Sequence, residues 1–151
     1  MTIKKLLTAL LLLTGALLAG NASGQHTNLS KSGLAIEGYD PVAYFSGNAS
    51  KGNKAIAAKY QSATYYFNSE ANRKKFLANP TAYLPQYGGW CAYAMGASGE
   101  KVEIDPETFK ILDGKLYLFY NAYFNNTLPK WDKDEKNLKE RADNNWKKIN
   151  G

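Results

Sequence analysis

The sulfur atoms of Cys91 and Met95 are the strongest candidates for chemistry in this sequence. Cys91 is the only cysteine of the chain, and Met95 is the only methionine besides Met1. The two lie four residues apart in the segment GGWCAYAM, so they would share one face of a helix. Both sulfurs are soft ligands that could help to bind copper(I) or haem iron. The alternative is that both side chains belong to the core, because free cysteine is commonly buried and methionine fills irregular gaps.

Aromatic side chains are the second candidate for a site. The chain contains 11 tyrosines, and such rings either line ligand pockets or fill cores while their hydroxyls reach polar partners. The residues that could line a pocket are Tyr44, Tyr66, Tyr87, Trp90 and Tyr93. Gly88 and Gly89 precede a predicted helix, where they could expose backbone amides to an anion or allow a turn to pack closely.

Catalytic groups are scarce in the sequence. The single histidine, His26, lies near the predicted mature N-terminus, so the folded body has no imidazole to act as a general base. No Ser–His–acid set can be assembled, and a cysteine nucleophile would lack its activating histidine. We therefore expect a protein that is not an enzyme.

The N-terminal residues have the pattern of a secretory signal. Two lysines precede an apolar run of 13 residues, Leu6–Leu18, and small residues follow it. The run is shorter than the roughly 20 residues of a membrane span, although an uncleaved anchor is the alternative. We predict a signal peptide over residues 1–24, a flexible leader over 25–33 and one folded domain over 34–149, in a periplasmic or secreted protein.

Composition restricts the classes of partner. The formal net charge of the 151-residue chain is +6, but its lysines and arginines form no continuous basic stripe, so we expect no nucleic acid. No membrane contact is expected after signal cleavage. The expected partner is an unidentified protein or small ligand. We find no internal repeat in the sequence.

The predicted elements form a small α+β domain in which antiparallel hairpins pack against helices. The predicted hairpins pair residues 54–60 with 64–67 and 109–112 with 115–121, and the second closes at Asp113-Gly114. Helices are predicted after the cap Ser69, over 90–95 and over about 133–148. The last of these is amphipathic, with an apolar stripe formed by Trp131, Leu138, Ala142 and Ile149.

The segment from Tyr60 to Leu84 resembles a YHS domain. The resemblance rests on an aromatic lead-in, a serine, a phenylalanine and an Asn-Pro-x-x-Tyr-Leu tail, here Tyr65-Tyr66-Phe67, Ser69, Phe76 and Asn79–Leu84. With GYDPVAYF, PQYGGWCAYA and DGKLYLFYN, residues 34–149 are similar to the exported bacterial subfamily of YHS domain-containing proteins. Members of the family that bind metal carry two pairs of cysteines. The corresponding positions here hold Asp40, Ala43, Asn68 and Asn72.

The resemblance therefore implies an exported, non-catalytic binding module that lacks the usual metal ligands. Asparagine amides are poor ligands for zinc or copper. A metal species or small ligand near Cys91 and Met95 remains one expectation, with copper or haem as the cofactors to consider and no cofactor as the default. The alternative is a protein–protein interaction domain in which Cys91 is a core residue.

Overall fold

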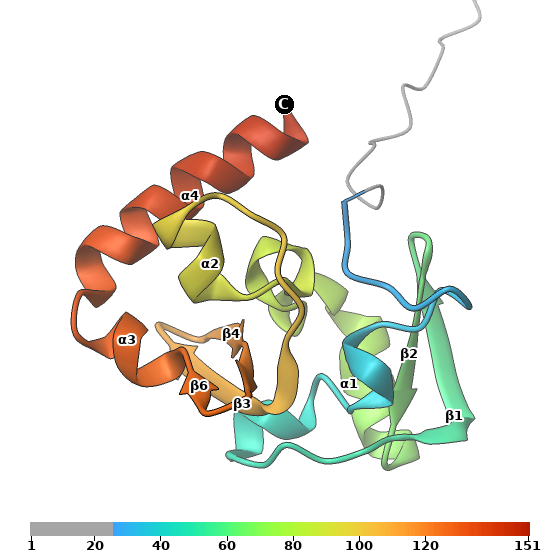
Figure 1. Ribbon diagram of the computed structural model, residues 1–151. Coiled ribbons are helices and arrows are strands. Elements are labelled where there is room, and N and C mark those ends of the chain that lie inside the picture. Colours follow the sequence, from blue (N-terminus) through green and yellow to red (C-terminus); the bar gives the residue numbers. More distant parts are fainter. Residues whose placement is uncertain (1–25) are drawn as a thin grey trace, which may run out of the picture.

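A computed structural model describes residues 26–151 (Figure 1). The predicted signal peptide therefore lies outside the described residues. Within them the fold is α+β, as predicted, with antiparallel hairpins and helices. The strands are β1 Asn53–Tyr60, β2 Ala63–Phe67, β3 Asp105–Leu112, β4 Lys115–Phe119, β5 Asn121–Ala122 and β6 Asn125–Asn126. The α-helices are α1 Glu70–Ala78, α2 Ala92–Ala97, α3 Leu128–Asp132 and α4 Glu135–Asn150, and the short 3-10 helices are η2 Ile36–Gly38, η3 Ala43–Ser46, η4 Pro80–Ala82 and η5 Gln86–Gly89.

Local sequence signals account for most of these elements. The Ser69 side chain accepts a hydrogen bond from the Asn72 amide and caps α1, which ends before Pro80. The β1–β2 and β3–β4 hairpins confirm the two predicted pairings, and their turns begin at Gln61 and Asp113, both with positive φ. The short β5–β6 hairpin and α3 were not predicted.

Strand β4 separates two clusters of buried residues. Leu116 and Leu118 pack into a first cluster, which also holds Phe67 and Phe76. Tyr117 and Phe119 point to the opposite face and pack into a second cluster around Trp131, Leu138 and Ala142. Side chains alternate along a strand, and here both faces of β4 are buried.

Helix α4 forms one wall of the second cluster. Figure 1 shows α4 lying along α2 at one side of the molecule, with the β1–β2 hairpin and α1 at the other. A side-chain carbon added at Gly96 would come within 2.4 Å of the Leu138 carbonyl oxygen, so the two helices touch backbone to backbone there. The predicted stripe packs as expected, but Trp131 belongs to α3 rather than to the last helix.

The chain contains an internal repeat that we did not find in the sequence. Each of the β1–β2 and β3–β4 hairpins has an eight-residue strand, a two-residue turn and a five-residue strand. In each, the register shifts after the first pair. In each hairpin the side chain of the first residue also accepts a hydrogen bond through Oδ1 from the backbone amide two residues later. The acceptors are Asn53 (2.9 Å) and Asp105 (3.0 Å).

The segments that precede the hairpins repeat as well. Leu34 and Pro85 each form a parallel bridge to the second strand of the following hairpin. Each is followed by three residues with positive φ, at 50°, 51° and 83° over 36–38 and at 57°, 61° and 84° over 87–89. We call residues 34–68 the first unit and residues 85–120 the second unit.

Residues 26–33, which belong to the predicted leader, contact the folded domain. The Asn28 amide donates to the Gly88 carbonyl oxygen at 2.8 Å, and the indole of Trp90 donates to the His26 carbonyl oxygen at 2.6 Å. Leu29 also forms a bridge with Ala35. The backbone at His26 and Asn28 therefore packs against the second unit.

Candidate ligand-binding site

Cys91 and Met95 are both fully buried, with 0% of each residue exposed. Cys91 lies at the N-cap of α2 with non-helical backbone angles and packs in the first cluster, whereas Met95 lies inside α2 and packs in the second. The structure therefore does not bring the two sulfurs together on one helix face. Cys91 belongs to the core.

The Cys91 sulfur accepts a hydrogen bond from the Tyr120 amide, with Sγ and N 3.3 Å apart. It also lies 3.5 Å from Thr127 Oγ1, which in turn donates to the Tyr120 carbonyl oxygen. The thiol thus fixes the backbone just after β4. This position follows from the repeat, because Asp40 does the same after β2.

Asp40 is a buried carboxylate that accepts four hydrogen bonds. Oδ1 accepts from the amides of Val42 (2.8 Å) and Ala43 (3.3 Å), and Oδ2 accepts from the Asn68 amide (2.9 Å) and Asn72 Nδ2 (2.8 Å). The four positions that the YHS resemblance assigns to metal ligands in other proteins therefore meet at one place. Here that place is a closed hydrogen-bond network.

These residues do not fit a metal. Both Asp40 oxygens are already acceptors for N–H groups, and Asn72 points its amide nitrogen, a donor, at the carboxylate. Soft metals need several thiolate or imidazole ligands. Over residues 26–151 there is no group of three or more His, Cys, Asp or Glu side chains arranged to hold an ion.

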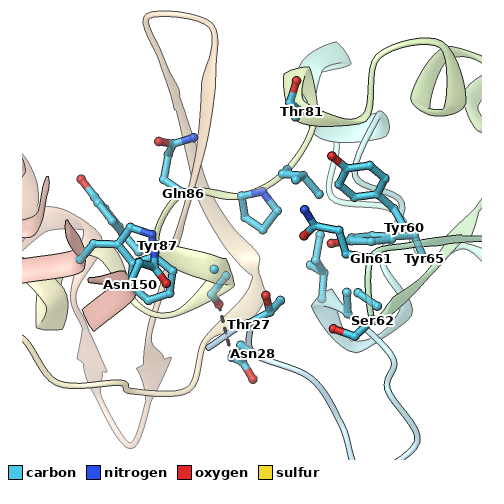
Figure 2. Close-up of a pocket in the computed structure, with 18 residues that line it drawn as sticks. Thr27, Asn28, Tyr60, Gln61, Ser62, Tyr65, Thr81, Gln86, Tyr87 and Asn150 are labelled. Carbon is cyan, nitrogen blue, oxygen red and sulfur yellow. Dashed lines mark hydrogen bonds between the residues drawn. The ribbon is translucent and has the colours of Figure 1, made fainter. Parts of the chain in front are cut away.

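A cavity of about 260 Å³ lies between the two units and the C-terminal helix (Figure 2). The first unit contributes residues near η2 and the tip of the β1–β2 hairpin, the second contributes η5, and α4 contributes its last turns. Its eighteen described lining residues are Thr27, Asn28, Ala35, Ile36, Tyr60, Gln61, Ser62, Ala63, Tyr65, Thr81, Leu84, Pro85, Gln86, Tyr87, Gly88, Gly89, Trp146 and Asn150.

The lining is apolar and aromatic with amide and hydroxyl groups at its edge. Tyr60 and Tyr65 lie on one side in Figure 2, and Tyr87 lies across from them. Tyr87 is held by a 2.8 Å hydrogen bond from its hydroxyl to Asp143 Oδ1, which fixes that wall to α4. Burial and the Asp143 carboxylate both raise the pKa of Tyr87, so its hydroxyl stays protonated.

Tyr65 brings a hydroxyl to this cavity without a partner among the described residues. Tyr65 is only 3% exposed, and its ring packs against Phe76. No fully buried side-chain nitrogen or oxygen of residues 26–151 lacks a partner, so this hydroxyl is not enclosed but opens into the cavity that it lines. Burial raises the pKa of Tyr65, which keeps the group neutral.

Of the five aromatic residues predicted to line a pocket, only Tyr87 does so. Tyr44 is buried in the first cluster and donates to the Pro106 carbonyl oxygen at 2.6 Å. Tyr93 and Trp90 pack around the second cluster, and Tyr66 lies beside Gly38 on the hairpin. The sequence predicts the hairpin that holds Tyr60 and Tyr65, but no local pattern places that hairpin beside η5.

Gly88 serves close packing. It has a φ of 61°, and an added side-chain carbon would lie 2.7 Å from the Trp146 ring. Its carbonyl oxygen accepts a hydrogen bond from Asn28. Of the two alternatives for this glycine pair, the contacts favour packing of a turn, in this case against α4.

Comparison with models of known protein families, with curated proteins and with solved structures finds no match. The similarity to YHS domains therefore stays a prediction. In the part of the chain that the structure describes, no helix has the length and apolar character needed to cross a membrane.

Proposed function

We propose that this chain is an exported, non-catalytic binding module whose small ligand occupies the cavity between the two units. The observation that carries the proposal is the cavity itself, an aromatic-walled space of about 260 Å³ with polar groups at its edge. Ligand pockets have this character, although most are somewhat larger, so the ligand is small. The buried sulfurs of Cys91 and Met95 do not support a site there, so we place the ligand elsewhere than the sequence suggested.

The lining supports a binding role more than a catalytic one. None of the eighteen described lining residues is a histidine, cysteine, aspartate, glutamate or lysine, the usual acids, bases and nucleophiles of enzymes. Two of the tyrosines that line the cavity, Tyr65 and Tyr87, have raised pKa values, which disfavours their use as bases near neutral pH.

A blocking variant tests the proposal. Ser62 is exposed at the hairpin turn and lines the cavity, so Ser62→Trp should fill it without disturbing the core. Ser46→Trp places the same side chain at an exposed position away from the cavity and is the matched control. A screen of small molecules by thermal shift should yield compounds that stabilise the wild type and Ser46→Trp but not Ser62→Trp. A ligand at about 100 times its Kd adds about 2.7 kcal/mol of stability. A screen with no such compound, or with equal shifts in both variants, would contradict the proposal.

Export is part of the proposal and has its own measurement. The periplasmic or culture-medium fraction of expressing cells should contain a protein whose mass corresponds to cleavage near residue 24. A full-length mass in the membrane fraction would contradict it.

The β5–β6 hairpin favours a second candidate function, binding to a protein. Tyr123 and Phe124 form its turn, are respectively 91% and fully exposed, and both have positive φ. Such turns usually hold Asn and Gly, and a left-handed conformation costs other residues about 1–2 kcal/mol each. Two strained, exposed rings are poor choices for folding, and strain of this kind is typical of functional sites.

The surroundings of Tyr123 and Phe124 favour an apolar pocket on a protein rather than an anionic membrane. The neighbouring strand residues are the uncharged Asn121, Asn125 and Asn126, and a single lysine, Lys130, contacts them by donating to Asn125 Oδ1 at 2.7 Å. Membrane surfaces attract clusters of several basic residues.

Photo-crosslinking in cells tests this second function. A crosslinker at position 124 should give one discrete protein adduct that is lost in Tyr123→Ser. A crosslinker at Leu77, which is 49% exposed on α1, is the control. Equal adducts at both positions, or lipid adducts at position 124, would contradict it.

A further inference from the structure

We infer that the cavity binds an uncharged, ring-containing small molecule that forms a hydrogen bond with the Tyr65 hydroxyl. This inference rests on the proposed function, since it names the chemical class of ligand for the same cavity. Three features of the lining carry it: its charge, its aromatic walls and the group on Tyr65.

The lining is neutral to an extent that the composition does not explain. About a fifth of the chain's residues are charged, yet none of the eighteen described lining residues carries a charge. A charged ligand that leaves water needs an opposite charge or several hydrogen bonds to compensate. With no such charge in the lining, an ammonium or carboxylate group would be poorly accommodated. The cavity therefore selects against ions of either sign.

The walls fit a flat ring. Tyr60 and Tyr65 of the hairpin face the side formed by Tyr87, and Trp146 of α4 also lines the cavity (Figure 2). Aromatic side chains stack on ring systems or meet their edges with centroids about 4.5–7 Å apart. A cavity of about 260 Å³ is larger than the engineered cavity of about 150 Å³ that accepts benzene. One substituted ring therefore fits, and a large cofactor does not.

The Tyr65 hydroxyl gives the cavity a fixed polar point. Tyr65 is 3% exposed, and its ring contacts that of Phe76 with centroids 4.9 Å apart, so the hydroxyl position is well defined. The hydroxyl forms no hydrogen bond within residues 26–151, and since it is not a fully buried atom it opens into the cavity, where a neutral hydroxyl can both donate and accept. A ligand with an amide, hydroxyl or ring nitrogen at its edge would satisfy it.

Three probes of nearly equal shape test the charge class: benzamide, benzoate and benzamidine. The first is neutral, the second an anion and the third a cation at pH 7. Titrations followed by the amide NMR signals of the lining residues should show benzamide binding about tenfold or more tightly than either ion. The Ser62→Trp variant should abolish the shifts, and Ser46→Trp should keep them.

Tyr65→Phe tests the hydrogen bond. Loss of one hydrogen bond should weaken benzamide binding about three- to tenfold, with the fold intact as judged by the NMR spectrum. Tyr117→Phe is the matched control, because Tyr117 is 1% exposed and lies in the second cluster rather than in the cavity lining. It should leave benzamide binding unchanged.

Each outcome decides the inference. If benzoate or benzamidine shifts the cavity signals as strongly as benzamide, the neutral class is overturned while the proposed binding function stands. If benzamide binds Tyr65→Phe and wild type equally, the role of the hydroxyl is overturned. If none of the three probes shifts the cavity signals, the ring class is overturned, and the broader thermal-shift screen with Ser62→Trp decides the proposed function separately.

Discussion

Cys91 occupies in the second unit the position that Asp40 occupies in the first. The backbone amide of Asp40 donates to the Ser50 carbonyl oxygen at 2.8 Å, and that of Cys91 donates to the Val102 carbonyl oxygen at 2.9 Å. Each side chain also accepts a hydrogen bond from the backbone amide just after the second strand of the hairpin in its unit. The lone thiol is therefore explained as a hydrogen-bond acceptor in a buried turn.

Two replacements of Cys91 should reveal this role, because they should lower the free energy of unfolding by different amounts. Cys91→Ala removes the acceptor and leaves a small cavity, so it should lower the free energy of unfolding by about 2–3 kcal/mol. Cys91→Ser keeps an acceptor for the Tyr120 amide and should cost less, about 1 kcal/mol. Chemical denaturation measures both. The opposite order, with serine worse than alanine, would show that the sulfur acts only as an apolar filler.

The Asp40 network should depend on both carboxylate oxygens. Asp40→Asn replaces one acceptor with an amide donor, which then faces N–H groups, so we expect a loss of about 2–4 kcal/mol in the free energy of unfolding. Asp113→Asn is the control, because Asp113 is exposed at the β3–β4 turn with positive φ, which asparagine tolerates. Equal, small effects in a urea titration would mean that the network adds little.

At the level of elements, the β3–β4 and β5–β6 hairpins differ in how well their residues suit the conformation of the turn. Asp113-Gly114 closes β3–β4 with residues that accept positive φ, whereas Tyr123-Phe124 closes β5–β6 with residues that do not. The first turn was predicted from its sequence. The second was not, because a Tyr-Phe pair carries no turn signal.

Tyr123→Asn together with Phe124→Gly should stabilise the fold. The new pair suits a two-residue turn with positive φ at both positions, so the free energy of unfolding should rise by about 1–2 kcal/mol. Thermal denaturation measures the change. A lower melting temperature would show that the two rings are supported by contacts within the chain, against their high exposure. If the hairpin binds a protein, the same variant should lose the adduct.

The parts of the fold that the sequence predicts depend on neighbouring residues, whereas the parts that it does not predict depend on residues far apart in the chain. Ser69, Asn79-Pro80 and Asp113-Gly114 act on their immediate neighbours, and the elements that they delimit were predicted. The repeat consists of equivalent backbone angles and hydrogen bonds in the two units. Different residue types supply them, since Ile36 corresponds to Tyr87 and Asp40 to Cys91, so a comparison of residue types does not reveal the repeat. The cavity joins segments far apart in the chain, which local patterns cannot bring together.

For the whole molecule, buried tyrosines predict loss of stability in alkali. Burial raises the pKa values of Tyr44, Tyr65 and Tyr87 above the ordinary value near 10. Above that pH the unfolded chain releases these protons while the folded chain keeps them. The stability is therefore complete below about pH 10 and falls as pH rises further, by about 1.4 kcal/mol per pH unit for each tyrosine.

Urea denaturation between pH 8 and 11 measures this dependence. Tyr65→Phe removes one of the three groups, so its stability should fall less steeply above about pH 10 than that of the wild type. Identical slopes would indicate that Tyr65 ionises as freely in the folded protein as in the unfolded chain.

The burial of both faces of β4 means that neither half of the molecule is a domain in its own right. A chain that stopped at Leu84 would keep the whole first unit and α1, yet Leu116 and Leu118 would no longer cover Phe67 and Phe76. The later half alone would in turn expose those two leucines to water. Two units of like construction have thus become mutually dependent, and separately expressed halves should regain structure only when they are mixed.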